Sequence, residues 1–345
     1  MKLKQHYITL TTIFAFAMTL TACGGGSSGD GGTTTPTARA AITVDSSNAE
    51  SITGTAYDGF AEQQNSIALN PTTSTNSNSG TQAPITVGKI ANDYLSLKNN
   101  NQNSVVASAA ITTGTTACNG GGSITVTNTS IAYANCRQDY FDGSYDITNG
   151  SASIDNLLQS GDKNACTESI SGTFSFDNLT ELEYDKTDTL INSTSINGGI
   201  TFSSSQSLVN TVCTTTNSIS GKSFILKSNV QSVSFFNFNI DNTTDTSLNY
   251  SLDYNITLDI SALSGSLKFE TISPIVGVET NAYPTSGHIR LTANSKTAGV
   301  PALIDIEIDS SNNGGEITLT VDVDGTPGTD VGYPKTMSWA EFEAL

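Results

Sequence analysis

A run of alternating apolar and polar residues from position 248 to position 260 constrains the fold of this chain more than any other feature. Its apolar members are Leu248, Tyr250, Leu252, Tyr254, Ile256, Leu258 and Ile260. Strict alternation is typical of a β-strand with one buried face and one solvated face. At about 3.3 Å per residue this strand would run for roughly 40 Å, about twice the usual length, so its sheet must be large and must curl.

Shorter segments with the same alternation follow one another between turn residues from Gly122 onward. They carry Phe174 and Phe176; Phe236, Phe238 and Ile240; Leu267 and Phe269; and Ile289 and Leu291. No long helical pattern separates them. The sequence therefore predicts an all-β protein, an antiparallel meander that forms a large curved sheet, a sandwich or an incomplete barrel, with one or two short helices.

The last two predicted strands can be aligned residue by residue across a turn at 310–315. Apolar residues alternate in both, at Ile304, Ile306 and Ile308 in the first and at Ile317, Leu319, Val321 and Val323 in the second. The register that matches them pairs Ile308 with Ile317, Ile306 with Leu319 and Ile304 with Val321, and on the wet face Asp305 with Thr320 and Glu307 with Thr318. A slip by one residue would expose three isoleucines, so this register should be strongly held.

The region 41–117 is less regular than the rest. Within it Ile90, Tyr94 and Leu97 fall at i, i+4 and i+7, which predicts a helix over about 87–98 that covers part of the sheet. The polar composition of 65–82 favours a surface loop or local disorder.

A short helix is also predicted at the C-terminus. Ser338 and Glu341 have the spacing of a capping box. Trp339 and Phe342 lie at i and i+3, so the helix would pack the chain's one tryptophan onto the sheet.

The first 23 residues carry an export signal. Lys2 and Lys4 give a basic start, positions 8–20 are uncharged and largely apolar, and small residues precede Cys23. This pattern is a secretory signal and is too short to span a membrane. Leu20-Thr21-Ala22-Cys23 resembles the lipobox of bacterial lipoproteins. An ordinary cleaved signal with a chance cysteine is the alternative.

The resemblance implies that residues 1–22 are removed and that Cys23 becomes a lipidated N-terminus. It implies three acyl chains, and at about 0.8 kcal/mol per buried methylene these would give effectively permanent attachment. In such lipoproteins an aspartate directly after the cysteine retains the protein in the inner membrane. Gly24 stands at this position, which implies the outer membrane. Residues 23–40, rich in Gly, Ser and Thr, would form a flexible tether, and 41–345 a single β-rich domain.

The charge of the chain narrows its possible partners. The formal net charge is −18, and the loss of Lys2 and Lys4 with the signal would bring it to about −20. A chain this acidic repels nucleic acid and anionic lipid headgroups. The acidity would also keep a surface rich in Ser, Thr and Asn soluble without any partner.

Four cysteines remain once Cys23 is set aside, namely Cys118, Cys136, Cys166 and Cys213. An even number in an exported chain predicts two disulfides, for which three connectivities exist. Sequential pairing, Cys118 with Cys136 and Cys166 with Cys213, is favoured because it joins neighbouring strands. A zinc site is the alternative, but CxxC spacing is absent and the chain has two histidines.

Signals for catalysis are weak. His288, the histidine outside the signal, alternates with Ile289 and Leu291 and so points to the wet face, two residues from Ser286. GxSxG, GxGxxG, P-loop and HExxH motifs are absent. A glycosidase would need two carboxylates that converge in a cleft. The candidates alternate on solvated strand faces and are Asp253, Asp259, Asp305, Glu307 and Asp309.

A calcium site is one interpretation of the segment 322–330. Asp322, Asp324 and Asp330 resemble in their spacing the acidic ligands of DxDGDGxxD loops in calcium-binding bacterial proteins. Thr326 stands in place of the third acidic ligand and Pro327 in place of the turn glycine. These departures favour a plain turn, and the remaining carboxylates would bind calcium weakly.

A set of residues between positions 283 and 339 carries a second resemblance. The set comprises Tyr283, Pro284, Ser286, Gly287, Asp322, Asp324, Gly325 and Trp339. In this pattern the C-terminal part is similar to a group of uncharacterised proteobacterial outer-membrane lipoproteins. The similarity brings no activity with it.

These features predict a lipid-anchored protein of the outer membrane, on its periplasmic or its outer face, with a non-enzymatic binding or structural role. Its expected partner is outer-membrane lipid, through the acyl chains on Cys23. The alternatives are a calcium-supported surface adhesin, a carrier of lipid or another hydrophobic ligand, and an envelope polysaccharide hydrolase. Carriage would require an open apolar groove on the sheet.

Overall fold

A computed structural model describes most of the chain beyond the N-terminal region. The described residues are 36–67 (backbone alone for 60–67), 90, 94, 114–162, 164–229, 231–281, 283–297, 299–309, 315–325, 330 and 332–345. The helices are α1 (Ala49–Ile67) and α3 (Trp339–Phe342). The strands are β1 (Thr43–Val44), β2 (Gly114–Ala117), β3 (Ser123–Val126), β4 (Ser130–Asp139), β5 (Tyr145–Ser160), β6 (Ser169–Tyr184), β7 (Leu190–Val209), β8 (Val212–Ser228), β9 (Ser232–Asp245), β10 (Asn249–Ile260), β11 (Ser266–Val278), β12 (Ser286–Ser295), β13 (Pro301–Ile308), β14 (Glu316–Asp322) and β15 (Lys335–Ser338).

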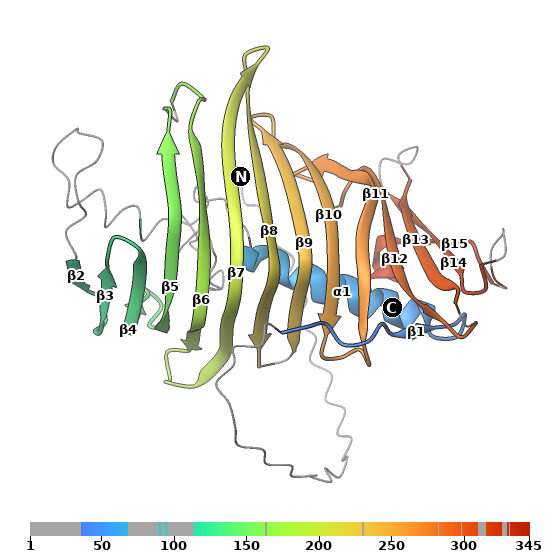
Figure 1. The fold of residues 1–345 in the computed structure, drawn as a ribbon, viewed down its shortest axis with the longest axis horizontal. Helices are drawn as coiled ribbons and strands as arrows, with labels where there is room; N and C mark the ends of the chain where they lie inside the picture. Colours follow the sequence, from blue (N-terminus) through green and yellow to red (C-terminus); the bar gives the residue numbers. More distant parts are fainter. Residues whose placement is uncertain are drawn as a thin grey trace, which may run out of the picture. The chain divides into compact units, whose positions relative to one another are not determined.

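Within this part of the chain, fifteen strands form one sheet (Figure 1). From β2 to β15 each strand pairs antiparallel with the next along the chain, and β1 pairs in parallel with the end of β12. β2 and β15 are the two edges of the sheet. The predicted all-β meander is thereby confirmed, as a single large open sheet.

The two faces of the sheet differ in polarity, as β10 illustrates. Tyr254, Ile256 and Leu258 are buried on what we call the apolar face, whereas Asp253 and Asn255 are exposed on the polar face. The predicted long strand is therefore confirmed, except at its first residue. Leu248 lies in the preceding turn with φ of 65° and is exposed.

Aromatic side chains from neighbouring strands pack against one another on the apolar face. The rings of Phe174 and Phe202 stack at 5.1 Å, and those of Phe224 and Phe235 lie 6.4 Å apart. These rings are almost fully buried. The hydrophobic core of the protein therefore lies on the apolar face and extends over most strands of the sheet.

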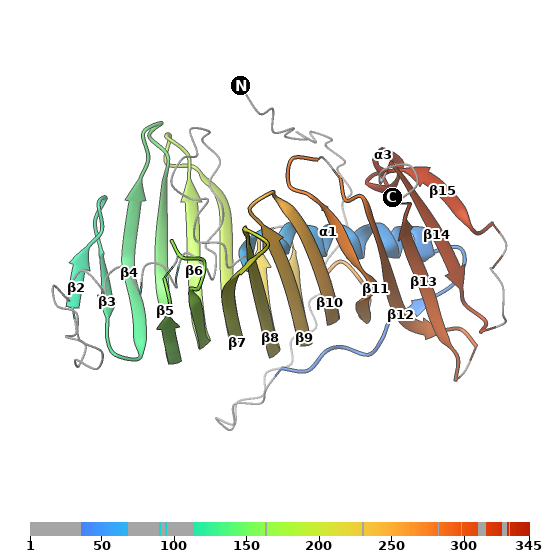
Figure 2. The same ribbon diagram turned by 90° about the horizontal axis from the view of Figure 1, so that it is seen from above.

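Helix α1 covers part of the apolar face, and Figure 2 shows it on a single side of the sheet. A Cβ atom at Gly59 would lie 2.7 Å from Ile260 Cδ1, and one at Gly54 would lie 2.8 Å from the backbone of Leu345, so both glycines allow close packing. Tyr57 makes an edge contact with Phe342, with ring centres 5.1 Å apart. This helix was not predicted from the sequence.

The two predicted helices have different outcomes. Of the helix over 87–98, the structure describes Ile90 and Tyr94, which are helical and fully buried; the Tyr94 hydroxyl donates to Asn128 O at 2.7 Å. The rest of that helix lies outside the described residues. The C-terminal helix is confirmed with its capping box between Ser338 and Glu341.

A line of β-bulges crosses the sheet from β4 to β9. Asn135, Asn178 and Asn237 have φ values of 47°, 47° and 46° at bulges in β4, β6 and β9. Gly150 and Gly198 hold the corresponding places in β5 and β7 with φ of 104° and 106°. Asn and Gly adopt such positive φ values at the lowest cost. Because bulges bend strands and increase their twist, this line bends the sheet.

One sequence prediction fails at this line of bulges. Phe236 and Phe238 alternate in the sequence, which predicts that they share a face. The bulge between them places them on opposite faces, because Phe236 pairs with Thr257 and Asn239 with Asn255, both on the polar face. Phe238 therefore lies on the apolar face, next to Asn239 in the strand.

The register predicted for the last hairpin is confirmed. β13 and β14 pair Ile308 with Ile317, Ile306 with Leu319, Ile304 with Val321, Asp305 with Thr320 and Glu307 with Thr318. The apolar members are all buried. The turn residues 310–314 lie outside the described part of the chain.

Candidate functional site

One end of the sheet is closed by the segment through which the chain enters the fold. Residues 36–48, which we call the strap, run across the ends of β10, β11 and β12 and lead into α1 (Figure 1). Ile42 N donates to Ser266 O at 2.8 Å, and Asn294 N donates to Ile42 O at 2.9 Å. We call this end the strap end; the β4–β5, β6–β7, β8–β9 and β10–β11 turns lie at the same end.

Arg39 binds the first part of the strap to the end of β10. Its Nε and Nη2 donate to Asp259 Oδ1 at 2.8 and 2.6 Å, and Nη2 also donates to Ile260 O at 2.6 Å. In return, Ser266 Oγ donates to Arg39 O at 2.7 Å. Arg39 falls within the predicted tether, 23–40, but these contacts make it part of the folded domain.

Asp45 binds the second part of the strap, just before α1, to the β12–β13 turn. Its Oδ1 accepts hydrogen bonds from Ser47 N at 2.8 Å and Asn48 N at 3.1 Å, and its Oδ2 pairs with the Lys296 ammonium. Lys296, and then Ser47, hold the pKa of the Asp45 carboxyl well below its usual range. The strap is thus bound to β10 at one point and to the β12–β13 turn at another.

Three of the exposed large apolar residues that the structure describes lie at the strap end. Phe141 is at the tip of the β4–β5 turn with a relative exposure of 113%. Leu190 and Ile191 begin β7 directly after the β6–β7 turn, with exposures of 49% and 48%. We call Phe141, Leu190 and Ile191 the apolar tips.

An aromatic stack lies beside the apolar tips. The Arg137 guanidinium is 3.6 Å from the centre of the Tyr145 ring, and the rings of Tyr145 and Tyr184 stack at 4.9 Å with 13° between their planes. Arg137 Nε also donates to Asp139 Oδ1 at 2.6 Å. The cation over the ring and the stacked pair hold β4, β5 and β6 together near their turns.

Acidic residues gather on the opposite face of the same strands. Asp146 follows Tyr145 in β5, is 5% exposed and pairs across the strands with Glu183. The Tyr140 hydroxyl donates to Asp146 Oδ2 at 2.6 Å. Burial, and then the charge of Asp146, raises the pKa of the Glu183 carboxyl. Because Tyr140 already binds the Asp146 carboxylate, we interpret the pair as a feature of the fold rather than a reaction centre.

A surface depression of about 670 Å³ lies beside the strap. Its lining comes from the strap, from β10 to β13 and from the β12–β13 turn, and half of the lining residues carry hydroxyl or amide side chains, including Thr257, Thr292 and Asn294. Lys268, which also lines it, is ion-paired with Glu270. The volume is within the range of small-molecule pockets, but a paired charge and short polar side chains define no class of ligand.

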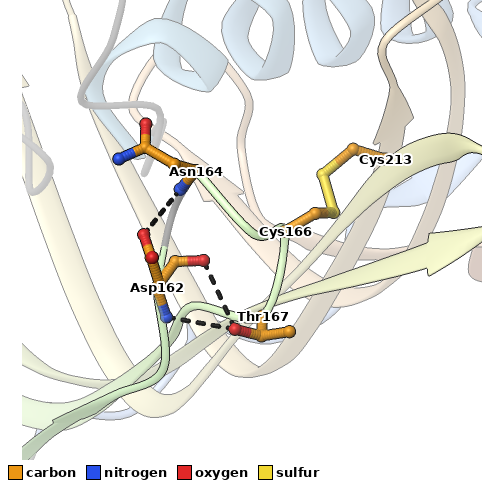
Figure 3. The surroundings of a disulfide bond; sticks show 5 residues. All are labelled: Asp162, Asn164, Cys166, Thr167 and Cys213. Atoms are coloured by element: carbon orange, nitrogen blue, oxygen red, sulfur yellow. Dashed lines mark hydrogen bonds between the residues drawn. A yellow bond between two sulfur atoms is a disulfide. The ribbon is translucent and has the colours of Figure 1, made fainter.

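Both predicted disulfides are confirmed. They are Cys118–Cys136, with Cα atoms 5.5 Å apart, and Cys166–Cys213, with Cα atoms 5.8 Å apart. The second joins the β5–β6 turn to β8, and Asp162 N donates to Thr167 Oγ1 at 3.1 Å in the same turn (Figure 3). This disulfide stabilises the end of the sheet opposite the strap.

Two of the three predicted calcium ligands, Asp322 and Asp330, accept hydrogen bonds from backbone N–H groups after β14. Asp322 Oδ1 accepts from Gly325 N at 2.8 Å, and Asp330 Oδ2 accepts from Val323 N at 2.6 Å. In the described part of the chain, no group of three or more His, Cys, Asp and Glu residues could hold a metal ion. Because 326–329 lie outside that part, a calcium site that includes Asp324 stays a prediction.

His288 belongs to an ion-pair network on the polar face. His288 Nε2 lies 2.9 Å from Asp305 Oδ1, and Arg290 donates to the same carboxylate through Nε at 2.7 Å and Nη2 at 3.0 Å. Burial opposes ionisation of Asp305, but the bonds from Arg290 and then His288 leave its pKa below the usual value. The predicted orientation of His288 away from Ile289 and Leu291 is confirmed.

Comparison of the chain with protein-family models, with curated proteins and with solved structures finds no match. Cys23 lies outside the described residues, so its lipidation stays a prediction. No helix in the part of the chain that the structure describes is long and apolar enough to cross a bilayer.

Proposed function

We propose that this protein is a lipid-anchored component of the cell envelope, held to the outer membrane by acyl chains on Cys23, with a non-enzymatic binding or structural role. The structural observation that supports the proposal is the path of the strap into the fold. The chain that follows the export signal enters the fold at the strap end, where Arg39 and Asp45 bind it to the sheet. An anchor at Cys23 would therefore hold the sheet by this end.

The reach of the chain supports this orientation. Cys23 and Pro36 are about 13 residues apart, which corresponds to at most about 45 Å when fully extended. β7 has 20 residues and so runs roughly 60 Å from the strap end to the opposite end. The strap end lies within reach of the anchor, and the far end of β7 lies beyond it.

The two faces of the sheet favour a binding or structural role. Phe174, Phe235 and Phe269 of the apolar face are already fully buried, which argues against an open apolar groove for lipid carriage. On the polar face, Asp305 pairs with Arg290 and His288 in the manner of a cross-strand stabilising network. A partner would therefore contact the polar face of the sheet or its turns.

Metabolic labelling with radioactive palmitate tests the proposal. We expect label in the purified wild-type protein and in the outer-membrane fraction, and no label in Cys23→Ala. Cys166→Ala with Cys213→Ala is the matched control, because it removes two cysteines that the fold uses and leaves Cys23 in place. Unlabelled wild-type protein, or label that persists in Cys23→Ala, would overturn the proposal.

A further inference from the structure

We infer that the apolar tips, Phe141, Leu190 and Ile191, form a docking surface for a zwitterionic phospholipid membrane. The inference rests on the proposed function, because the lipid anchor is what would bring the strap end to the bilayer. It adds that the folded domain itself touches the membrane, through a defined set of side chains.

The apolar tips are presented by turns with internal backbone hydrogen bonds. In the β4–β5 turn, Tyr140 N donates to Ser144 O at 3.0 Å and Gly143 N to Tyr140 O at 3.1 Å, with Phe141 between them. In the β6–β7 turn, Asp185 N donates to Thr189 O at 3.0 Å. Phe141 is thus held outward by its turn, and docking would order little additional backbone.

The two turns lie side by side. A Cβ atom at Gly143 would be 3.3 Å from Lys186 Cβ, which places the tip of one turn against the other. Phe141 and Leu190 therefore project from neighbouring turns of the same end. Together they form one small surface rather than scattered exposed residues.

A chain of contacts links the apolar tips to the strap. Arg39 binds Ile260 O, Ser232 N donates to Ser261 Oγ at 2.9 Å, and Asn229 Nδ2 donates to Ile191 O at 3.4 Å. Each contact joins one turn of the strap end to the next. The point at which the anchoring chain enters the fold and the apolar tips therefore belong to one continuous end of the sheet.

A second group of exposed apolar residues lies at the opposite end, so the two groups must be compared as possible membrane contacts. Leu158, Leu208 and Val209 are exposed at the opposite end, near the Cys166–Cys213 disulfide. Leu208 and Val209 are separated from the strap end by the length of β7, roughly 60 Å, which exceeds the span of the 13 or so residues after Cys23. An anchor at Cys23 therefore favours contact of the bilayer with the apolar tips over contact with Leu208 and Val209.

The charges around the apolar tips favour a neutral membrane surface. The hydrogen bonds from Ser144 and from Thr187 lower the pKa of Asp142 and of Asp185, so both carboxylates stay ionised beside the tips. With Asp188 these carboxylates outnumber the one cation of the β6–β7 turn, Lys186, so anionic headgroups would be repelled. Partial insertion of three apolar side chains into zwitterionic lipid would be weak in solution, but tethering supplies an effective concentration of the order of millimolar.

Depth-dependent fluorescence quenching tests the inference. Phe141→Trp is introduced into the full-length acylated protein, which is reconstituted into vesicles of phosphatidylcholine with or without brominated acyl chains. The matched control is Leu208→Trp, also at an exposed turn but at the opposite end. Trp339 is buried and present in both, so the wild-type signal is subtracted.

We expect brominated lipid to quench the tryptophan at position 141 at least about threefold more than the tryptophan at 208, because an interfacial side chain reaches the acyl boundary. Equal quenching at both positions, or none at 141, would overturn the inference. Melting curves that match the wild type establish that both variants fold.

The same preparations separate the two proposals. If palmitate labelling of Cys23 fails, the proposed function fails with it and neither variant associates with vesicles. If Cys23 is acylated and the protein binds vesicles, but the tryptophan at 141 is not quenched, the lipid anchor stands and the docking surface alone is wrong.

Discussion

Arg39 and Asp259 are 220 residues apart in the sequence, yet their hydrogen bonds join the start of the fold to strand β10. Arg39 donates to Asp259 Oδ1 through Nε and Nη2, and its backbone N donates to Asp259 Oδ2 at 2.8 Å. The Asp259 side chain is 11% exposed, so this carboxylate depends on the strap for its hydrogen bonds. The strap is therefore an integral part of the sheet.

Arg39→Ala should lower the free energy of unfolding by about 1 to 3 kcal/mol, because it leaves a largely buried carboxylate without its charged partner. Urea denaturation with an unchanged m-value measures the loss. Lys222→Ala, which removes an exposed cation of β8, should change stability by less than about 0.5 kcal/mol. If the two variants behaved alike, the strap would not depend on this bond.

Asn178→Val should be less stable than Asn178→Gly by at least about 1 kcal/mol, since a β-branched residue resists positive φ. Asn178 has φ of 47°, and its backbone N donates to Asn197 Oδ1 at 2.8 Å. Thermal melting of both variants measures the difference.

Ser175, an exposed residue of the same strand, provides the control for the bulge. At this ordinary strand position the order should reverse, with valine more stable than glycine. The same order at both positions would mean that the bulge does not impose the left-handed conformation.

Glu183→Gln should stabilise the protein at neutral pH and much less in acid. The folded pKa of Glu183 lies above its ordinary value of 4.5, so the folded state holds this proton more tightly than the unfolded state does. Stability therefore falls as pH rises from 4.5 through the folded pKa, and the glutamine variant avoids this loss.

The melting temperatures of the Glu183→Gln variant and the wild type, compared at pH 4 and pH 7, measure the effect. Ser175→Ala, at an exposed position of the same strand that carries no ionisable group, should show no comparable dependence on pH. A stabilisation of Glu183→Gln that is equal at both pH values would contradict the account of this carboxyl pair.

The two disulfides should differ in their contribution to stability. They close loops of 47 and 18 residues, for which the chain-entropy model gives about 4 and about 3 kcal/mol. The Cys166→Ala, Cys213→Ala variant should therefore unfold at lower urea concentration than the Cys118→Ala, Cys136→Ala variant. The reverse order would mean that loop length does not govern their effect.

Much of the fold follows from the sequence because strand pairing is specified locally. The apolar residues of 304–308 and 317–321 alternate with the same period, so one register alone buries both sets, and the structure has that register. The capping box at Ser338 and Glu341 likewise involves side chains three residues apart. Such local patterns can be recognised in one sequence.

Other features escaped prediction for physical reasons. α1 was missed because its buried positions include Ala49, Thr53 and Ala56, small residues with no strong apolar pattern, and because glycine disfavours helix. The bulges were missed because an extra residue such as Asn237 reverses the alternation on which strand faces were assigned.

The candidate site could not be predicted because its residues meet through the topology of the sheet. Nothing in the sequence pairs Arg39 with Asp259, and alternation had placed Asp259 on the wet face. One sequence feature indicated this surface. Phe141 is an aromatic residue beside turn-forming residues, in the turn Tyr140-Phe141-Asp142-Gly143. Its exposure became evident from the structure alone.

The most direct test of the central claim is mass spectrometry of the N-terminal peptide of the protein purified from membranes. A lipid-anchored protein should begin at Cys23 and carry the mass of its acyl chains on that residue. A peptide that retains residues 1–22, or one that begins at Cys23 with a free thiol and amine, would contradict the account.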